Sequence, residues 1–387
     1  MAEPSVAGDA PEVELPVVVM RGGTSKGVFC RLADLPAAGP DRDRLLLALM
    51  GSPDPMQLDG LGGTHSSTSK VVAVGPGREP GVDVEYLFAQ VGVDRPVVDL
   101  AGNCGNLTAA VGPYALDERL VERPVVPAGT AVSQSGAGAV LMLLNLNTGV
   151  RIRATVPLTS GGRAAWAGST VIDGVPGSGA PIVSEYLDPA GSVTGKLLPT
   201  GSARDAIAGH EVTVLDVTTP YVFVRAAAFG LSGGESPADL NTRADLLVEL
   251  ERLRAACGAA IGVTSAAVPR MILLASPPSG GEAADLDVRV LATSMQRVHH
   301  AVPITGALCT AAARGLAGTI TAEVAGPAPE VPGGSGVVRV GHPKGVVEAT
   351  VELDEAGGDV RAVGVVRTAR RLLAGTAYVP VAVGGRA

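Results

Sequence analysis

The sequence predicts a mixed α/β protein made of two similar domains. Its 387 residues are enough for two domains of ordinary size. Short apolar runs bounded by glycine and proline alternate with runs whose apolar residues have helical spacing. The segment from Cys104 to Leu107, followed by TAAVG, resembles the segment from Thr305 to Leu308, followed by CTAAA. A match this short also arises by chance, but as a duplication it predicts two helix N-termini that face one cleft between the domains.

The first third of the chain is expected to form a tail, several strands and two helices. Residues 1–13 are the tail, which we expect to be disordered. The run LPVVVM predicts a buried strand, and RGGTSKG after it predicts a glycine-rich turn. RDRLLLALMG predicts a short amphipathic helix that ends at its glycine. The polar loop GLGGTHSSTS leads into a strand at KVVAVG, VDVEYLFAQVGV alternates like a second strand, and a helix is expected near residues 106–118.

The rest of the chain begins with predicted strands, at AVLMLLNLNTGVRIRATV, GVPGSGAPIVSEYL and HEVTVLDVTTPYVFVRA. One long helix is expected over residues 236–262, because a Ser-Pro start and a final glycine bracket apolar residues at helical spacing. RMILLASPP predicts another strand. The segment from LDVRVLATS to CTAAARGLAG then repeats the earlier order of strand, polar loop and small-residue helix.

The composition excludes several classes of protein. Hydrophobic residues make up 46% of the chain and charged residues 18%, as in a globular protein and not a disordered one. A net charge of −8 and an aromatic content of 3% argue against a nucleic-acid partner. No apolar run reaches the ~20 residues of a membrane span, and the acidic start MAEPSVAGDAPEVEL is unlike a signal peptide. We therefore expect a cytoplasmic protein without membrane contact.

The four cysteines indicate free thiols. Cys30, Cys104, Cys257 and Cys309 lie far apart in the sequence, and no two of them form a CxxC pair. This spacing predicts neither a zinc site nor a disulfide framework, so we expect no bound metal and a reducing compartment.

The loop GNCGN places Cys104 where a loop becomes a helix. The first N–H groups of a helix have no partner within it, and the helix dipole adds positive charge there. Such an end can bind a carboxylate and lower the pKa of a cysteine below its usual ~8.5. Gly102 and Gly105 let the backbone approach a ligand closely. The loop is thus suited to holding an acid group while the thiol reacts beside it, and the alternative is a buried, inert cysteine in a tight turn.

The segment MRGGTSKG carries further candidate site residues. Arg21 can bind a carboxylate through two parallel hydrogen bonds, Thr24 and Ser25 supply hydroxyls, and Lys26 adds a point charge. The segment matches neither a phosphate-binding P-loop nor a dinucleotide-binding loop. The alternative is a turn at the surface.

Two other positions stand out by residue type. Lys70 is one of only four lysines in the chain and lies among hydroxyl side chains at the start of a strand. In a dry pocket such a lysine can exchange protons near neutral pH, whereas the alternative is a lysine placed there by chance. The pair His299 and His300 precedes the second loop-to-helix junction and is either part of the site or a structural pair. No GxSxG motif is present, so a serine hydrolase is not supported.

Seven segments together resemble the PrpF family: MRGGTSKGVF, GGTHSSTSKVV, DLAGNCGNLTAAVGPYAL, DGVPGSGAPI, GKLLPTG, VTVLDVTTPYVFV and HHAVPITGA. The family includes isomerases and tautomerases of methylaconitate, methylitaconate, oxalomesaconate and aconitate. The resemblance implies the diaminopimelate-epimerase-like fold, an α/β (α+β) fold of two pseudo-symmetric domains, each a curved mixed sheet around a central helix. On this basis we expect an N-terminal domain of residues 14–184 plus 370–387 and a C-terminal domain of residues 185–369.

The resemblance also assigns chemistry to single residues. Epimerases of this fold use two cysteines on opposite faces of a carbon, and here the two positions hold Cys104 and Thr305. A threonine hydroxyl does not ionise readily, so this departure argues against the racemisation of an amino acid. Lys70, in the SSTSK segment, is implicated with the first cysteine in acid–base chemistry. Thr219 stands where the family commonly has an asparagine before proline, and Cys309 is expected to pack in the core.

The function expected from the resemblance is the shift of a double bond in an unsaturated di- or tricarboxylate, without a cofactor. Cys104 and Lys70 are the expected catalytic pair. The residues expected to bind substrate are Arg21, Thr24, Ser25, Lys26, Ser66, Ser67, Asn103, Gly105, Asn106, His299, Thr305 and Gly306. Two alternatives stay open: a two-base racemase or epimerase, and a non-catalytic accessory protein for an aconitase-like dehydratase. The expected partner is the small-molecule substrate, with a homodimer as the possible assembly.

Overall fold

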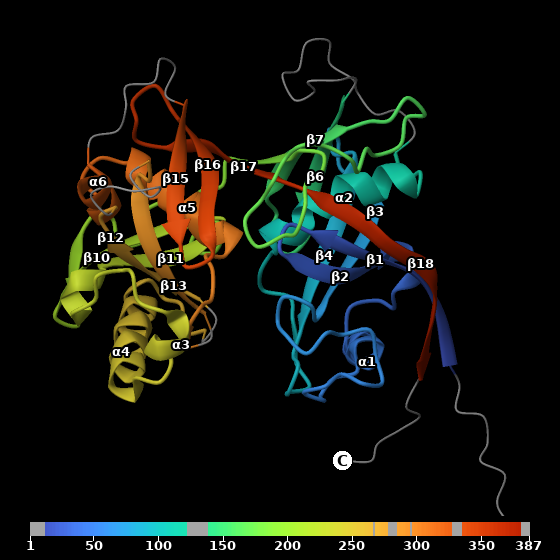
Figure 1. Ribbon diagram of the computed structural model, residues 1–387, viewed down its shortest axis with the longest axis horizontal. Coiled ribbons are helices and arrows are strands. Elements are labelled where there is room, and N and C mark those ends of the chain that lie inside the picture. Colours follow the sequence, from blue (N-terminus) through green and yellow to red (C-terminus); the bar gives the residue numbers. More distant parts are fainter. Residues whose placement is uncertain are drawn as a thin grey trace, which may run out of the picture.

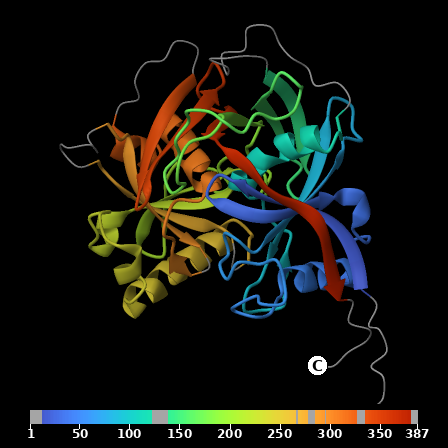
Figure 2. The same cartoon turned by 45° about the vertical axis from the view of Figure 1, so that its right-hand side comes forward.

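The protein forms two lobes of similar size in the computed structural model (Figure 1). The structure describes residues 12–121, 138–265, 268–277, 285–294, 296–326 and 335–380. The first part of the chain builds one lobe and the later part builds the other, and the last long strand returns across the first lobe (Figure 2).

The first lobe contains the strands up to β8 and two α-helices. Its strands are β1 (Glu12–Gly22), β2 (Ser25–Arg31), β3 (Lys70–Pro76), β4 (Val84–Val91), β5 (Val98–Asp99), β6 (Gly138–Asn145), β7 (Arg151–Pro157) and β8 (Ile182–Leu187). Its helices are the short 3₁₀ helix η1 (Leu32–Asp34), α1 (Pro40–Met50) and α2 (Gly105–Asp117). Helix α1 ends at Gly51, whose φ of 71° is left-handed and suits glycine.

The second lobe repeats this order with more helix. Its strands are β9 (Asp205–Ile207), β10 (His210–Val217), β11 (Thr219–Arg225), β12 (Arg270–Ala275), β13 (Val288–Ser294), β14 (Arg297–Val298), β15 (Ser335–His342), β16 (Gly345–Leu353) and β17 (Val360–Arg367), followed by β18 (Ala369–Pro380). Its helices are η2 (Ala226–Phe229), α3 (Pro237–Leu240), α4 (Ala244–Ala260), α5 (Ile304–Gly315) and α6 (Ile320–Ala325).

The strand pairing shows that the two lobes share one plan. In the first lobe β1 pairs antiparallel with β2, β2 parallel with β3, β3 antiparallel with β4, β4 parallel with β6, and β6, β7 and β8 follow antiparallel. The strands from β10 to β17 repeat this sequence of pairings, with β14 in the place of β5. Each parallel pair needs a crossover, and helices α1, α2, α4 and α5 lie in the four crossovers. The short sequence match near Cys104 and Thr305 therefore marks equivalent positions.

Two strand pairings join the lobes in the described part of the chain. Strand β8, the last of the first plan, pairs antiparallel with β17, the last of the second. Strand β18 then pairs along the whole of β1, from Gly22 with Ala369 to Glu12 with Pro380. The domain boundaries expected from the sequence stay a prediction.

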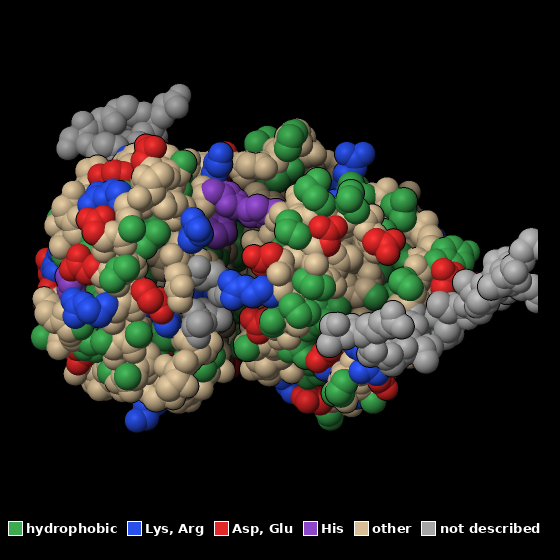
Figure 3. Space-filling model, turned by 90° about the horizontal axis from the view of Figure 1, so that it is seen from below, with side chains coloured by type: hydrophobic (Ala, Val, Ile, Leu, Met, Phe, Trp, Pro, Cys, Tyr) green, Lys and Arg blue, Asp and Glu red, His purple; other side chains and the backbone are tan. Residues whose placement is uncertain are grey.

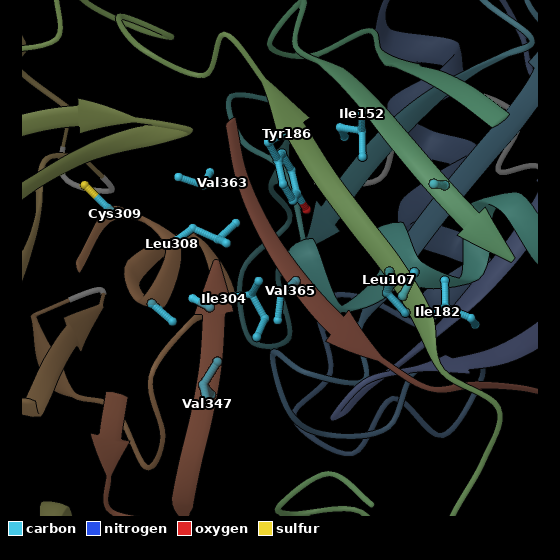
Figure 4. Close-up of a cluster of buried hydrophobic side chains, with 14 of the residues drawn as sticks. Leu107, Ile152, Ile182, Tyr186, Ile304, Leu308, Cys309, Val347, Val363 and Val365 are labelled. Carbon is cyan, nitrogen blue, oxygen red and sulfur yellow. The ribbon is translucent and has the colours of Figure 1, made fainter. Parts of the chain in front are cut away.

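The central helices α2 and α5 form the core. Residues Leu107 to Leu116 of α2 and Ile304 to Arg314 of α5 are all buried, because alanine, glycine and threonine side chains let the sheets wrap closely around them. A continuous apolar cluster links both helices through the β8–β17 pair, and Figure 4 shows Leu107, Ile304, Tyr186, Val363 and Val365 within it. This junction places the first turn of α2 next to that of α5.

Two details of the sequence prediction are wrong. The single helix expected over residues 236–262 is two helices, α3 and α4, because the chain leaves the helical conformation at Arg243, whose φ and ψ are −88° and 87°. Two residues earlier, the Asn241 side chain bonds both the N–H and the carbonyl of Val298, each at 2.9 Å, and ties the end of α3 to the second-lobe sheet. Glu12 and Val13 belong to β1 and not to a tail, because they pair with β18. Residues 1–11 and 381–387, including the rest of the expected tail, lie outside the described residues.

Two more boundaries are wrong. The strand expected at GVPGSGAPIVSEYL begins only at Ile182, because Gly174 and Gly177 turn the chain with φ of 82° and 77°, and Ser25 to Gly27, expected in the turn, belong to β2, where they pair with β1. The remaining expected strands and helices are confirmed within two or three residues at their ends.

Candidate active site

The first turns of α2 and α5 are in contact at the boundary between the lobes. A Cβ added at Gly105 would lie 2.7 Å from Cγ2 of Ile304 and 3.1 Å from Oη of Tyr186. Only glycine fits this approach, because those distances are shorter than van der Waals contact. Gly105 thus allows the two helix ends to meet, and the ligand approach expected at its backbone stays a prediction. The two helix N-termini lie together at the lobe boundary, and the expectation that they face one cleft stays a prediction.

Cys104 is the N-cap of α2 and is half-buried. Its N–H donates to Oδ1 of Asn103 at 2.7 Å, and its Sγ lies 3.8 Å from Oγ of Ser25. Burial alone would raise the pKa of this thiol. The Lys70 ammonium, the backbone N–H groups at the start of α2 and the Ser25 hydroxyl outweigh burial and lower that pKa below its ordinary value. The helix end therefore favours a thiolate at Cys104.

The other three cysteines have the opposite character. Cys30, Cys257 and Cys309 are buried. Burial raises the pKa of Cys30 and of Cys257 to about 12, and it raises the pKa of Cys309 well above its ordinary value. The interpretation of an inert, packed cysteine applies to these three side chains and does not apply to Cys104.

Lys70 is the first residue of β3 and is buried at 9% exposure. Its Nζ donates to Oε1 of Gln90 at 2.8 Å and lies 5.2 Å from the centroid of the Phe88 ring. Nε2 of Gln90 donates in turn to the carbonyls of Ser66 and Ser69, at 3.1 and 2.9 Å. Gln90 therefore fixes both the ammonium group and the loop before β3.

Gln90 is a contact of the candidate site that the sequence did not predict. It lies directly opposite Lys70 in the antiparallel β3–β4 pair. A glutamine is unusual in the apolar run VEYLFAQV, and this could have marked Gln90 as a candidate. That Gln90 contacts Lys70 follows only from the register of β3 and β4, which the sequence does not give.

The turn between β1 and β2 is held against the start of α2. Asn106 donates from Nδ2 to Oγ1 of Thr24 at 3.1 Å and accepts from the Thr24 N–H at 3.3 Å. Nη1 of Arg21 donates to the carbonyls of Gly23 and Thr368, at 3.0 and 2.9 Å. These bonds place Ser25, the next residue along, beside the thiol of Cys104. They show Arg21 and Asn106 bracing the turn, and their predicted contacts with substrate stay predictions.

Several other predicted residues lie in this region. Oδ1 of Asn103 accepts from the Thr108 hydroxyl at 3.2 Å as well as from the backbone at Cys104. The Lys26 N–H donates to the carbonyl of Ser67 at 2.9 Å, and the Ser67 hydroxyl lies 3.0 Å from Nδ1 of His65. Ser66 is exposed in the same loop. The structure thus brings together the loop of residues 60–69, the turn after β1 and the start of α2.

The second-lobe side of the site differs at the position equivalent to Cys104. Thr305 is 4% exposed, and its Oγ1 lies 3.0 Å from Oη of Tyr221. A Cβ added at Gly306 would lie 3.1 Å from the same Oη. The hydroxyl of Thr305 is therefore engaged in a buried hydrogen bond, and Gly306 provides the space for that tyrosine.

Histidines from both lobes meet where the lobes join. The rings of His299 and His300 stack with centroids 4.4 Å apart, and the ring of His65 from the first lobe meets His300 edge to face with centroids 5.4 Å apart. Figure 3 shows histidine side chains gathered at this boundary. Burial, with the neighbouring His300 as the next cause, lowers the pKa of His299 to about 4, so this imidazole is neutral at pH 7.

Two similar lobes around paired central helices, with a thiol at the point where the helices meet, define a protein of the diaminopimelate-epimerase-like class. A hydroxyproline epimerase from Agrobacterium vitis shares this fold, with a TM-score of 0.53 and 14% identity over 95% of this chain and 94% of that one. The model of the family described as PrpF protein matches residues 12–380. The chain belongs to the PrpF family.

Relatives within this family are isomerases. The chain is 42% identical to a (4E)-oxalomesaconate Delta-isomerase from Novosphingobium sp. (strain KA1), over 94% of this chain and 97% of the relative. A crystal structure of a methylitaconate-delta-isomerase matches with a TM-score of 0.78 and 36% identity, over 95% of this chain and 96% of that one. The chain is a double-bond isomerase, and the family, fold and enzyme class expected from the sequence are confirmed. Among the helices within the described ranges, none is both long and apolar enough to cross a membrane.

Proposed function

We propose that the protein moves the double bond of an unsaturated di- or tricarboxylate by proton transfers at Cys104 and Lys70. The observation that carries this proposal is the placing of Cys104 at the N-cap of α2, where the charge of Lys70 and the helix N–H groups lower the pKa of its half-buried thiol. Relatives named for oxalomesaconate and methylitaconate support a substrate with two or three carboxylates.

The reaction requires a base near the C–H bond of the bound substrate and an acid near the far end of its double bond. A base removes a proton from the carbon next to the double bond, and the electron pair of that C–H bond delocalises into a dienolate. A proton is then delivered to the far carbon of the former double bond, so atoms and charge balance without a change in oxidation state. Cys104 and Lys70 exchange these protons, in an order that the chemistry leaves open. Such a transfer requires no cofactor.

The difficult species is the dienolate, which adds negative charge beside existing carboxylates. Fixed positive charge stabilises it without reorganisation. The starts of α2 and α5, together with the Lys70 ammonium, supply such charge in spite of the net charge of −8. The residues proposed to bind the carboxylates are Arg21, Thr24, Ser25, Lys26, Ser66, Ser67, Asn103, Gly105, Asn106, His299, Thr305 and Gly306.

The alternative of a two-base racemase is less well supported. It requires a second ionisable group at the position of Thr305, whose hydroxyl is buried and bonded to Tyr221. Cys309, the nearest other thiol in sequence, has a pKa raised by burial. The isomerase names of the relatives also disfavour a non-catalytic accessory protein. The homodimer and the cytoplasmic location stay predictions, which sedimentation of the pure protein and fractionation of cells would test.

The proposal is tested by incubating the protein in D₂O with aconitate, methylaconitate, methylitaconate and oxalomesaconate and recording proton NMR spectra. We expect one acid to exchange hydrogen at the two ends of an allylic unit as its double bond moves. Exchange at a saturated stereocentre alone would instead indicate a racemase. Binding without exchange for every acid would contradict the proposal.

Variants connect the exchange to the two residues. Cys104→Ser and Lys70→Met are each expected to lower turnover by at least ~100-fold, the usual range for a general acid or base. Cys257→Ala and Lys196→Met are the matched controls, because the Cys257 thiol is buried on α4 in a separate apolar cluster and Lys196 is exposed, both outside the proposed site. Wild-type turnover in Cys104→Ser would refute the assignment.

A further inference from the structure

Arg367 is the last residue of β17, where the chain leaves the β8–β17 junction for β18. Side chains alternate along a strand, so Arg367 shares a face with Val363 and Val365. Both valines lie in the apolar cluster beside Leu107 and Ile304 at the starts of the two central helices (Figure 4). Arg367 is 7% exposed, whereas Val366 on the opposite face is 39% exposed. The guanidinium is therefore directed into the interior between the lobes.

This buried cation has no carboxylate in ion-pair contact within the described part of the chain; the Asp173 carboxylate and the Tyr186 hydroxyl act on its charge only from farther away. The other two buried arginines each have a carboxylate in contact: Arg254 lies 2.7 Å from a carboxylate oxygen of Glu251, and Arg314 lies 2.8 Å from one of Asp287. The one hydrogen bond seen from the Arg367 guanidinium runs from Nη1 to the carbonyl of Val366, at 2.9 Å. A guanidinium has five N–H donors, and a buried charge is costly unless it is paired. Arg367 therefore holds donors available to an anion.

The backbone next to Arg367 is tied to the site of Cys104. The carbonyl of Thr368 accepts from the Gly23 N–H at 2.9 Å. Gly23 begins the turn that carries Ser25, whose Oγ lies 3.8 Å from Sγ of Cys104. The end of β17, which bears Arg367, is thus connected to Ser25 through the hydrogen bond between Thr368 and Gly23, because Gly23 lies two residues before Ser25.

Tyr186 provides a second observation on the same face. It lies opposite Val363 in the β8–β17 pair and is 1% exposed. Its Oη makes no geometrically defined hydrogen bond among the described residues, with the Thr108 hydroxyl as a polar neighbour, and it packs against Gly105 at the start of α2. A buried hydroxyl without a well-formed hydrogen bond and a buried guanidinium without a carboxylate in contact lie along one strand pair beside the thiol. Both are groups that an anion would satisfy.

We propose that Arg367 binds one carboxylate of the substrate through its guanidinium and so makes a second carboxylate a requirement for turnover. The inference rests on the proposed function of Cys104 and adds a specificity-determining residue to it. A planar carboxylate fits the guanidinium with two parallel hydrogen bonds, which a neutral group cannot form. The enzyme therefore selects polycarboxylates over unsaturated monocarboxylates of the same size.

The rate at which Cys104 is alkylated tests whether Arg367 binds a carboxylate, and the test needs no substrate. Iodoacetate and iodoacetamide both transfer a carbon to the thiolate with loss of iodide, and they differ in the carboxylate. The alkylation rate of Cys104 with each reagent is measured by mass spectrometry and divided by the alkylation rate of glutathione with the same reagent. We expect the iodoacetate-to-iodoacetamide ratio to be more than tenfold higher at Cys104 than in glutathione, and to fall at least tenfold in Arg367→Gln. Arg361→Gln is the matched control, an exposed arginine on the same strand, and leaves the ratio unchanged.

The outcomes separate this inference from the proposed function. No labelling of Cys104 by either reagent overturns the proposed function and the role of Arg367 with it. Labelling without a preference for iodoacetate in the wild-type protein, or with the same preference in Arg367→Gln, overturns only the role of Arg367. Near-UV circular dichroism checks folding, and Arg367→Met, which keeps the length of the side chain, is the second variant. With the acid found by NMR, KM rises more than tenfold in Arg367→Gln while kcat changes less, and a loss of kcat alone contradicts carboxylate binding.

Discussion

Replacing Gly105 by alanine tests whether contact between the two central helices positions the thiol. The added Cβ would lie 2.7 Å from Cγ2 of Ile304, a side chain that is 4% exposed and has no space to withdraw. Carbon atoms pack at about 3.5–4.0 Å, so the starts of α2 and α5 must separate by about 1 Å. Because Cys104 is the N-cap of α2, the separation moves the thiol relative to the second lobe.

The energies expected for Gly105→Ala predict a large loss of turnover and only a small loss of unfolding free energy. Overpacking a core costs about 1–3 kcal/mol, and the better helix propensity of alanine returns up to about 1 kcal/mol. We therefore expect Gly105→Ala to lose about 1–2 kcal/mol of unfolding free energy. A shift of 1 Å at a catalytic group lowers turnover by about 100-fold, which is the larger effect.

The assay is kcat/KM for the isomerised acid together with urea unfolding. Gly358→Ala is the control, because a Cβ there meets nothing within 4 Å and the residue lies between β16 and β17 outside the proposed site, so its turnover should stay within about twofold of wild type. If Gly105→Ala is as active as Gly358→Ala, the contact between the helices does not position the thiol.

Two further predictions concern groups around the site. Gln90→Leu removes the oxygen that accepts from the Lys70 ammonium at 2.8 Å and leaves a buried charge unpaired. Because a hydrogen bond to a charged group contributes about 1.5–3 kcal/mol, we expect kcat to fall at least about tenfold. Unchanged kinetics in this variant would contradict the role of Gln90. Burial lowers the pKa of both His299 and His342 to about 4, below the ~6.5 of an unfolded chain. The stability that these neutral histidines contribute is complete above pH 6.5 and is lost as the pH falls toward 4. Urea unfolding should therefore show that the free energy of unfolding falls by about 1–2 kcal/mol per histidine between pH 7 and pH 5, with a smaller fall in His299→Gln. Equal stability at pH 7 and pH 5 would contradict this prediction.

Local patterns in the sequence were enough to find the elements and the reactive loop. Apolar alternation located the strands, and the change from polar loop to small-residue helix located both junctions that meet at the lobe boundary. Cys104 could be singled out because a helix N-terminus acts on a thiol through local backbone geometry. The fold itself was predicted from the resemblance to the PrpF family, because the spacing of apolar residues does not show how the elements are arranged.

Contacts between distant segments could not be predicted in this way. The pairing of Gln90 with Lys70 depends on strand register, and the tie at the end of α3 depends on a bond from Asn241 to Val298 in another element. The contact of Gly105 with Ile304 could not be predicted either, because it joins two helices that lie far apart in the sequence. Arg367 has no local signal, because an arginine at a strand end is ordinary until burial and the lack of a carboxylate are known.

The pH dependence of Cys104 alkylation by iodoacetamide tests the central claim most directly. The account predicts a midpoint below the ~8.5 of an ordinary cysteine in the wild-type protein, and a higher midpoint in Lys70→Met but not in Lys196→Met. A wild-type midpoint at or above ~8.5, or one that Lys70→Met leaves unchanged, would contradict it.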